Sequence, residues 1–223
     1  MVQILGGAIV EEIFRTDSER IEEIRTRNNK MFGSALNILS FLNMLYLYFS
    51  VLISGLLAQN TEINLKLWKA YFNYLGLTGV FLGITYIIVG INYGRFGQIY
   101  RIKGAGIGSF LFTFWGLISA YDHAMLLIEN PTPTEILEAL KSTPEYYMFL
   151  YMLIPAVGYI LIGRGLFVAK VREHMPLPFK FGAILLIIGG ICYPVGLLMD
   201  LGVVLASIGS VISGTYLIHL SAK

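Results

Sequence analysis

Six long apolar stretches, separated by short polar segments, dominate the hydropathy pattern of this 223-residue chain. They cover residues 32–58, 70–93, 104–128, 147–169, 181–198 and 201–220. An α-helix rises about 1.5 Å per residue, so roughly 20 apolar residues cross about 30 Å of hydrocarbon. The stretches also lack the alternating polarity of barrel strands. The pattern therefore predicts an all-α integral membrane protein, built as a bundle of six transmembrane helices.

The last two stretches are separated only by the region around Asp200. One helix through both would have about 40 residues and would span far more than a bilayer. Pro194, Gly196 and Gly202 favour a tight turn. The sequence therefore predicts a helical hairpin here.

Basic residues are concentrated in alternate connections between the spans, which indicates the orientation of the bundle. The segment before residue 32 contains Arg15, Arg20, Arg25, Arg27 and Lys30. The segments between residues 93 and 104 and between residues 169 and 181 are basic, whereas 129–146 is acidic. Only the first connection runs against this pattern, because Lys66 and Lys69 outnumber Glu62. The positive-inside rule therefore predicts a multi-pass protein of the cell membrane with both termini in the cytoplasm.

Residues 1–30 are predicted to form a short cytoplasmic amphipathic N-terminal helix, ahead of the six-helix domain over residues 31–223. Apolar residues recur there at roughly helical spacing, at Ile13, Phe14, Ile21 and Ile24. Two interpretations are open. The arm lies on the membrane surface or on the chain's own loops, or it docks a partner.

Two helical hairpins share a sequence pattern. The segment Tyr86–Gly90 of one matches Tyr159–Gly163 of the other, and each is followed by a basic connection and then by a span that begins with glycine near its start. This pattern indicates a parallel repeat of a helical hairpin, a device found in transporters and in scaffold bundles. Chance alignment of apolar segments is the alternative.

Small residues recur at four-residue intervals along the last span and form a groove on one of its faces. Because no hydrophobic force joins helices inside lipid, close backbone contact through small residues is a main source of packing energy. The groove therefore predicts helix packing within the chain or an interface between subunits. The residues concerned are Gly202, Ala206, Ser210 and Gly214, with Gly79 and Gly83 as a further pair on the second span.

Composition agrees with the membrane class and excludes several others. Charged residues make up 13% of the chain, about half the share typical of soluble domains, and the mean hydropathy is +0.70. A net charge of +2 carries no nucleic-acid signature. Cys192 is the one cysteine, so no internal disulfide or cysteine-based metal site is expected.

Few ionisable residues interrupt the spans. Asp122 and His123 lie in the third span, Arg164 near the cytoplasmic end of the fourth, and Asp200 in the last turn between spans. Ionisable groups inside a membrane are costly and point to function by default, but the shallow depth of Asp122 and His123 also fits a solvated interfacial pair. Arg164 is expected to extend its side chain to the interface. These four residues form the candidate polar site.

No cofactor, metal or catalytic residue is predicted. His123 and His219 belong to opposite leaflets and therefore do not fit one haem. A metal site requires Asp122, His123 and Asp200 to converge at the outer face. The chain also lacks the recognised motifs of zinc proteases, serine hydrolases and P-loop NTPases.

The segments Tyr86–Gly90 and Lys180–Gly190 resemble those of small, uncharacterised polytopic membrane proteins of thermophilic archaea. The resemblance covers mainly the second to sixth spans, and its motifs are apolar. It implies a polytopic membrane fold and no particular activity.

Three functions remain in view. The first is a non-enzymatic membrane subunit or scaffold, in contact with the lipid bilayer and with a membrane-protein partner or further copies of itself. The second is a small transporter or channel, which should gather Asn37, Asn43, Asn73, Thr78, Thr85 and Asp122 around a cavity. The third is an intramembrane enzyme, which requires Asp122, His123 and Asp200 in one pocket.

Overall fold

The computed structural model describes residues 2–58, 65–169, 176–195 and 198–221, and the side chains within them except those of residues 2–18, 58, 65, 140, 145–148 and 150. This part of the chain is all-helical and contains no strand. Its helices are α1 (Val2–Ala58), α2 (Leu65–Ile99), α3 (Ala105–Glu129), α4 (Pro133–Ser142), α5 (Glu145–Val168), α6 (Leu177–Cys192) and α7 (Met199–Leu220).

Five of these helices contain segments long and apolar enough to cross a membrane, namely α1, α2, α3, α5 and α7. The sixth apolar helix, α6, has 16 residues, or about 24 Å. It ends at Cys192, short of the predicted limit of 198, where Pro194 lies in the turn that follows. Proline has no backbone N–H to continue a helix. The fold is therefore that of an α-helical membrane protein, with five long apolar helices and a shorter sixth.

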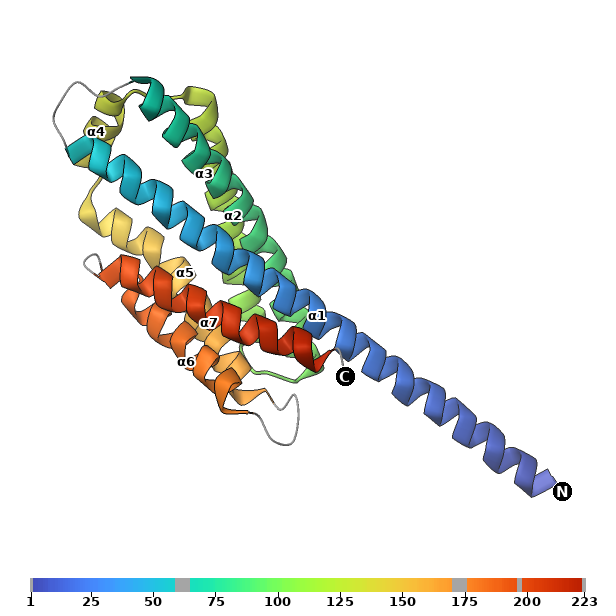
Figure 1. Ribbon diagram of the computed structural model, residues 1–223. Coiled ribbons are helices and arrows are strands. Elements are labelled where there is room, and N and C mark those ends of the chain that lie inside the picture. The colour runs from blue at the N-terminus through green and yellow to red at the C-terminus, as the bar shows by residue number, and fades with distance from the viewer. Residues whose placement is uncertain (1, 59–64, 170–175, 196–197, 222–223) are drawn as a thin grey trace.

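The six apolar helices pack as a closed ring (Figure 1). Each of α1, α2, α3, α5 and α6 contacts the next apolar helix in the chain, and α7 returns to contact α1. Successive apolar helices cross the bundle in alternate directions, so neighbours in the ring, including α7 and α1, are antiparallel. This closure gives the bundle an interior that all six helices face.

The N-terminal arm is not a separate helix. Helix α1 continues from Val2 through Lys30 to Ala58, and its first part projects beyond the bundle (Figure 1). No proline interrupts this stretch, and Gly33 is tolerated inside a helix. The predicted boundary between residues 30 and 31 is therefore not a break in the backbone. The side chains of Ile13 and Phe14 lie outside the described residues.

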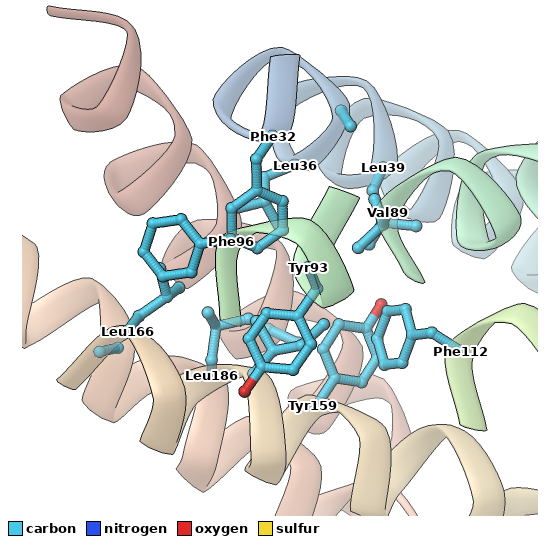
Figure 2. Packing of buried hydrophobic residues seen from close by; sticks show 14 of the residues in the cluster. Phe32, Leu36, Leu39, Val89, Tyr93, Phe96, Phe112, Tyr159, Leu166 and Leu186 are labelled. Atoms are coloured by element: carbon cyan, nitrogen blue, oxygen red, sulfur yellow. The ribbon is translucent and has the colours of Figure 1, made fainter. Parts of the chain in front are cut away.

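Aromatic side chains fill the core toward the end of the bundle where α1 leaves it (Figure 2). The ring of Phe32 lies 5.8 Å from that of Tyr93 and 5.2 Å from that of Phe96. Farther along the interior, the rings of Phe112 and Tyr159 meet edge to face at 5.0 Å. Edge-to-face and tilted arrangements let the positive edge of one ring meet the negative face of another. This core holds α1, α2, α3 and α5 in register.

The acidic connection between α3 and α5 contains helix α4, which the sequence analysis did not anticipate. Thr132 accepts a hydrogen bond from the Glu135 backbone N–H, and the Glu135 carboxylate accepts one from the Thr132 backbone N–H at 2.7 Å. Pro133 occupies the first helical turn, where its missing N–H costs nothing. The sequence Thr-Pro-Thr-Glu is thus a capping box, and this motif was the available signal.

This capping box makes the start of α4 sensitive to pH. Hydrogen bonds from the backbone and hydroxyl of Thr132 hold the pKa of the Glu135 carboxyl below its usual value. Because the pKa is lower in the folded state than in the unfolded state, the ionised carboxylate stabilises the helix at neutral pH. That stabilisation is lost as the pH falls through the folded-state pKa. Hydrogen exchange of the first turn, corrected for intrinsic rates, is expected to speed up between pH 7 and pH 3. The Glu135→Gln variant should lack this added pH dependence, and an unchanged profile would contradict the assignment.

The two hairpins that share a sequence pattern also share their packing. A Cβ atom placed on Gly90 of α2 would lie 2.8 Å from the carbonyl oxygen of Ser109 on α3. On Gly163 of α5 it would lie 2.7 Å from the carbonyl oxygen of Ala183 on α6. Equivalent glycines therefore let equivalent helix pairs approach at backbone contact.

The pair formed by α7 and α1 makes the same type of contact. A Cβ on Gly214 of α7 would lie 2.5 Å from the carbonyl oxygen of Gly33 on α1. Four residues before each of these three glycines stands a fully buried residue, namely Tyr86, Tyr159 and Ser210. The ring therefore consists of three similar helix pairs, each with one such buried residue a turn before its close contact.

The small-residue groove of α7 is used within the chain. Gly202 lies against Gly189 and Tyr193, and Ala206 is fully buried against Gly189. On α2, Gly79 lies against the ring of His123 and Gly83 against Ala120. Together with the buried Ser210 and Gly214, these contacts hold neighbouring helices of the ring together.

Candidate functional site

A cavity of about 330 Å³ lies inside the ring, toward the end of the bundle that carries α4. Residues of α1, α2, α3, α5 and α7 line it, together with Tyr193, which directly follows α6. Its polar lining consists of Asn43, Tyr46, Ser50, Tyr86, Ser119, His123, Tyr151 and Tyr193. Concave sites of this size, mostly apolar with a few convergent polar groups, are the usual form of a small-molecule site.

A buried hydrogen-bond network joins three helices at the inner end of the cavity. The side-chain amide of Asn43 donates to the Tyr159 hydroxyl at 2.7 Å, and the Tyr86 hydroxyl donates to the Asn43 carbonyl oxygen at 3.2 Å. The two hydroxyls also lie 3.0 Å apart. Because each hydroxyl has one proton and two lone pairs, Tyr86 and Tyr159 keep unused acceptor capacity. The network therefore ties α1, α2 and α5 together.

His123 forms a second polar group on the cavity wall. Its Nδ1 lies 2.7 Å from the carbonyl oxygen of Ser119, one turn earlier in α3. Since a carbonyl only accepts, Nδ1 carries a proton and donates. In the neutral ring, Nε2 then accepts from the Tyr46 hydroxyl at 2.9 Å. These two bonds fix the imidazole between α3 and α1.

Asp122 reaches the site through Tyr151. The Tyr151 hydroxyl donates to the Asp122 carboxylate at 2.9 Å, and its ring packs edge to face on Trp115 with centroids 4.3 Å apart. Asp122 itself is half-buried and is not among the lining residues. It therefore orients a lining residue from outside the cavity.

The structure does not gather the whole candidate polar site. His123 lines the cavity and Asp122 lies next to it, but Asp200 is exposed in the first turn of α7 and Arg164 is exposed on α5. Within the described residues, no three His, Cys, Asp or Glu side chains form a group that could hold a metal ion. The arrangement required for the metal site or the intramembrane enzyme is therefore not present in this part of the chain.

The set proposed for a translocation path is also divided. Only Asn43 of that set lines the cavity. Thr85 bonds to a carbonyl of its own helix, Asn37 donates to Thr215 at 3.4 Å, and Asn73 is exposed. Polar residues in the middle of a span thus either line the cavity or lie elsewhere on their helix, and the sequence pattern does not distinguish the two cases.

The tyrosines of the site were not predicted from the sequence as site residues. Tyr46 fits an interfacial aromatic belt, but it bonds with His123 on the cavity wall. Tyr86 and Tyr159 open the repeated Tyr-x-x-x-Gly segments, and the structure brings them together at the centre. Their equivalent places in the repeat were the signal that could have marked them.

The cavity wall has no formally charged residue among those that line it. Its hydrogen-bonding groups are hydroxyls, one amide, one imidazole and the indole of Trp115, and Leu47, Leu82, Met152 and Val203 add apolar surface. An uncharged wall gives a charged ligand no partner for its charge inside the protein. The chemistry therefore suits a small solute that forms hydrogen bonds and has an apolar part.

The ring and its cavity define an α-helical membrane protein with an apolar core and a tyrosine-lined cavity. No protein-family model, curated protein or solved structure matches this chain. The resemblance of Tyr86–Gly90 and Lys180–Gly190 to small membrane proteins of thermophilic archaea stays a prediction.

Proposed function

We propose that this chain binds a small, uncharged, hydrogen-bonding solute in its central cavity and passes it across the membrane as a small transporter or channel. One observation carries the proposal: residues of five helices, with Tyr193 after α6, converge on a cavity of about 330 Å³ whose wall is uncharged and mostly apolar, with several hydrogen-bonding groups. A scaffold needs no such space, because its helices would gain packing energy by closing it. The scatter of the other five mid-span polar residues is what a scaffold predicts, so the cavity alone favours solute binding over a purely structural role.

The proposal includes six spans in the cell membrane with both termini in the cytoplasm. Helix α6 is short, but it lies between α5 and α7 in the ring, and lipid thins locally around short helices at modest cost. Arg95, Arg101 and Lys103 lie at the end of the bundle near Arg27, in support of one basic cytoplasmic end. Loop residues Lys170 and Arg172 lie outside the described residues.

A second function, a subunit of a membrane complex, is favoured by the projecting part of α1. Ile21 is 54% exposed there, on a helix that continues beyond the bundle (Figure 1). An exposed apolar side chain on a protruding helix suits a docking surface. Co-purification of a second protein or of further copies, lost in the Ile21→Glu variant, would support this role.

Filling the cavity should block the proposed transport. Val203 lines the cavity on α7 and is 8% exposed, so the Val203→Trp variant places a large ring inside it. Proteoliposomes with the wild-type protein, tested by light scattering with small polar solutes such as glycerol and urea, are expected to show faster permeation than empty liposomes. We expect Val203→Trp to reduce the added permeation at least tenfold.

The matched control is Ile208→Trp, which adds the same ring to the outward face of α7, where Ile208 is 45% exposed. It should keep wild-type permeation. Equal loss in both variants would indicate general damage to the fold. Permeation that survives Val203→Trp in a protein with an unchanged melting temperature would remove the cavity from the path.

A further inference from the structure

A second pocket lies at the basic end of the bundle, between α1 and α2. It has a volume of about 300 Å³ and is separate from the central cavity, with no lining residue in common. Its polar lining is Arg27, Asn28, Arg95 and Gln98, and its apolar lining is Ile24, Met31 and Ile99. All four polar residues carry N–H donors, so the pocket can bind a ligand that has hydrogen-bond acceptors.

Asn28 supplies an unpaired donor to this pocket. Its side chain is 7% exposed, and its amide nitrogen Nδ2 has no hydrogen-bond partner in the described structure. The neighbouring Asn29 instead donates to the Tyr100 hydroxyl at 2.8 Å. A buried donor without a partner is costly, and a turn of the Asn28 side chain toward an acceptor oxygen in the pocket would remove that cost.

Two arginines add positive charge to the same space. Arg27 on α1 and Arg95 on α2 are both exposed, and neither forms an ion pair within the described residues. A guanidinium presents a planar fork of N–H groups that matches the oxygens of a phosphate. Glu22 and Glu23 on α1 are exposed and do not line the pocket.

The location identifies the source of the phosphate. Arg95 and Ile99 belong to the last turns of α2, where its apolar span ends, so the pocket lies at the level of lipid headgroups. Ile24, Met31 and Ile99 provide apolar surface beside the donors, which free phosphate does not use and a lipid does. Basic pockets between helices at the membrane surface are a known form of lipid site. We propose that this pocket binds the phosphate group of an anionic phospholipid.

The test is lipid binding by the purified full-length protein, measured by native mass spectrometry. The probes are phosphatidylglycerol, phosphatidylcholine and inorganic phosphate, each titrated separately. We expect phosphatidylglycerol to bind more tightly than phosphatidylcholine. The Arg27→Gln and Arg95→Gln variants should each weaken phosphatidylglycerol binding about fivefold, and the double variant by roughly the product of the two.

The control is Arg20→Gln, which removes an exposed arginine of α1 that does not line the pocket. It should bind phosphatidylglycerol as the wild type does. Equal loss in Arg20→Gln and Arg27→Gln would reduce the effect to general surface charge and overturn the site. Equal binding of the two lipids, or inorganic phosphate binding as tightly as phosphatidylglycerol, would overturn the lipid assignment. Solute permeation is measured separately, so failure of the lipid site and failure of the proposed transport are distinguishable.

Discussion

Replacing Gly33 with alanine is expected to lower the free energy of unfolding of the bundle by about 1–3 kcal/mol, because it forces a methyl group into a backbone contact. The added Cβ would lie 2.5 Å from the carbonyl oxygen of Gly214 and 3.0 Å from Cβ of Leu217. The first of these atoms belongs to the backbone of α7, so a side-chain rotation does not relieve the clash. The contact between α1 and α7 closes the ring, and its loosening should affect the whole bundle.

The same helix provides the control. A Cβ on Gly55 meets nothing within 4 Å, and Gly55 is exposed on α1. Alanine is favoured over glycine inside a helix by about 0.5–1 kcal/mol, so Gly55→Ala should be neutral or stabilising. Both variants are compared by reversible unfolding in mixed detergent micelles. If Gly33→Ala proves as stable as Gly55→Ala, the close approach of α1 and α7 is wrong.

Replacing Asn43 with leucine is expected to cost about 1–3 kcal/mol of stability and to impair the central cavity. Leucine keeps the approximate shape of asparagine but removes both hydrogen bonds that connect α1 to Tyr86 and Tyr159. The two hydroxyls then retain their mutual contact at 3.0 Å. The loss should be near the upper end of what single hydrogen bonds contribute in membrane bundles, because two bonds disappear together.

A double-mutant cycle isolates the network. Asn43→Leu is combined with Tyr159→Phe, and the stabilities of the single and double variants are compared. Because Asn43 donates to Tyr159, the double variant should cost less than the sum of the two single variants. The matched control pairs Asn43→Leu with Tyr216→Phe, since Tyr216 packs on Phe179 and does not line the cavity. Additive costs in the Tyr159 cycle would contradict a direct bond.

The three helix pairs of the ring connect these two predictions. The glycine contacts bring the helices of each pair to backbone distance, and one turn before them Tyr86, Tyr159 and Ser210 are buried. Two of these positions carry large side chains and the third a small one. The repeated glycines thus determine how closely the helices of each pair pack. The different side chains one turn before them determine how much space is left between the pairs.

The sequence by itself determined the class and the helices, because each follows from local chain properties. Apolar length against bilayer thickness identified the apolar helices, including α3 to within a few residues. The four-residue spacing of small residues from Gly202 to Gly214 was also evident in the sequence. Three features were not predicted. Helix α6 ends early because Pro194 follows it, and α1 is continuous because nothing breaks it near residue 30. Helix α4 forms because a capping box starts it.

Only the tertiary structure decided which residues form the site. In water, the buried face of a helix is more apolar than its outer face, but inside lipid both faces are apolar, as the exposed Phe41, Phe81 and Phe110 illustrate. The sequence therefore does not fix the rotation of each helix. The closed ring fixes it by backbone contact between glycines. That rotation brings Asn43, Tyr86 and Tyr159, from three different helices, to one point and leaves Asp200 outside.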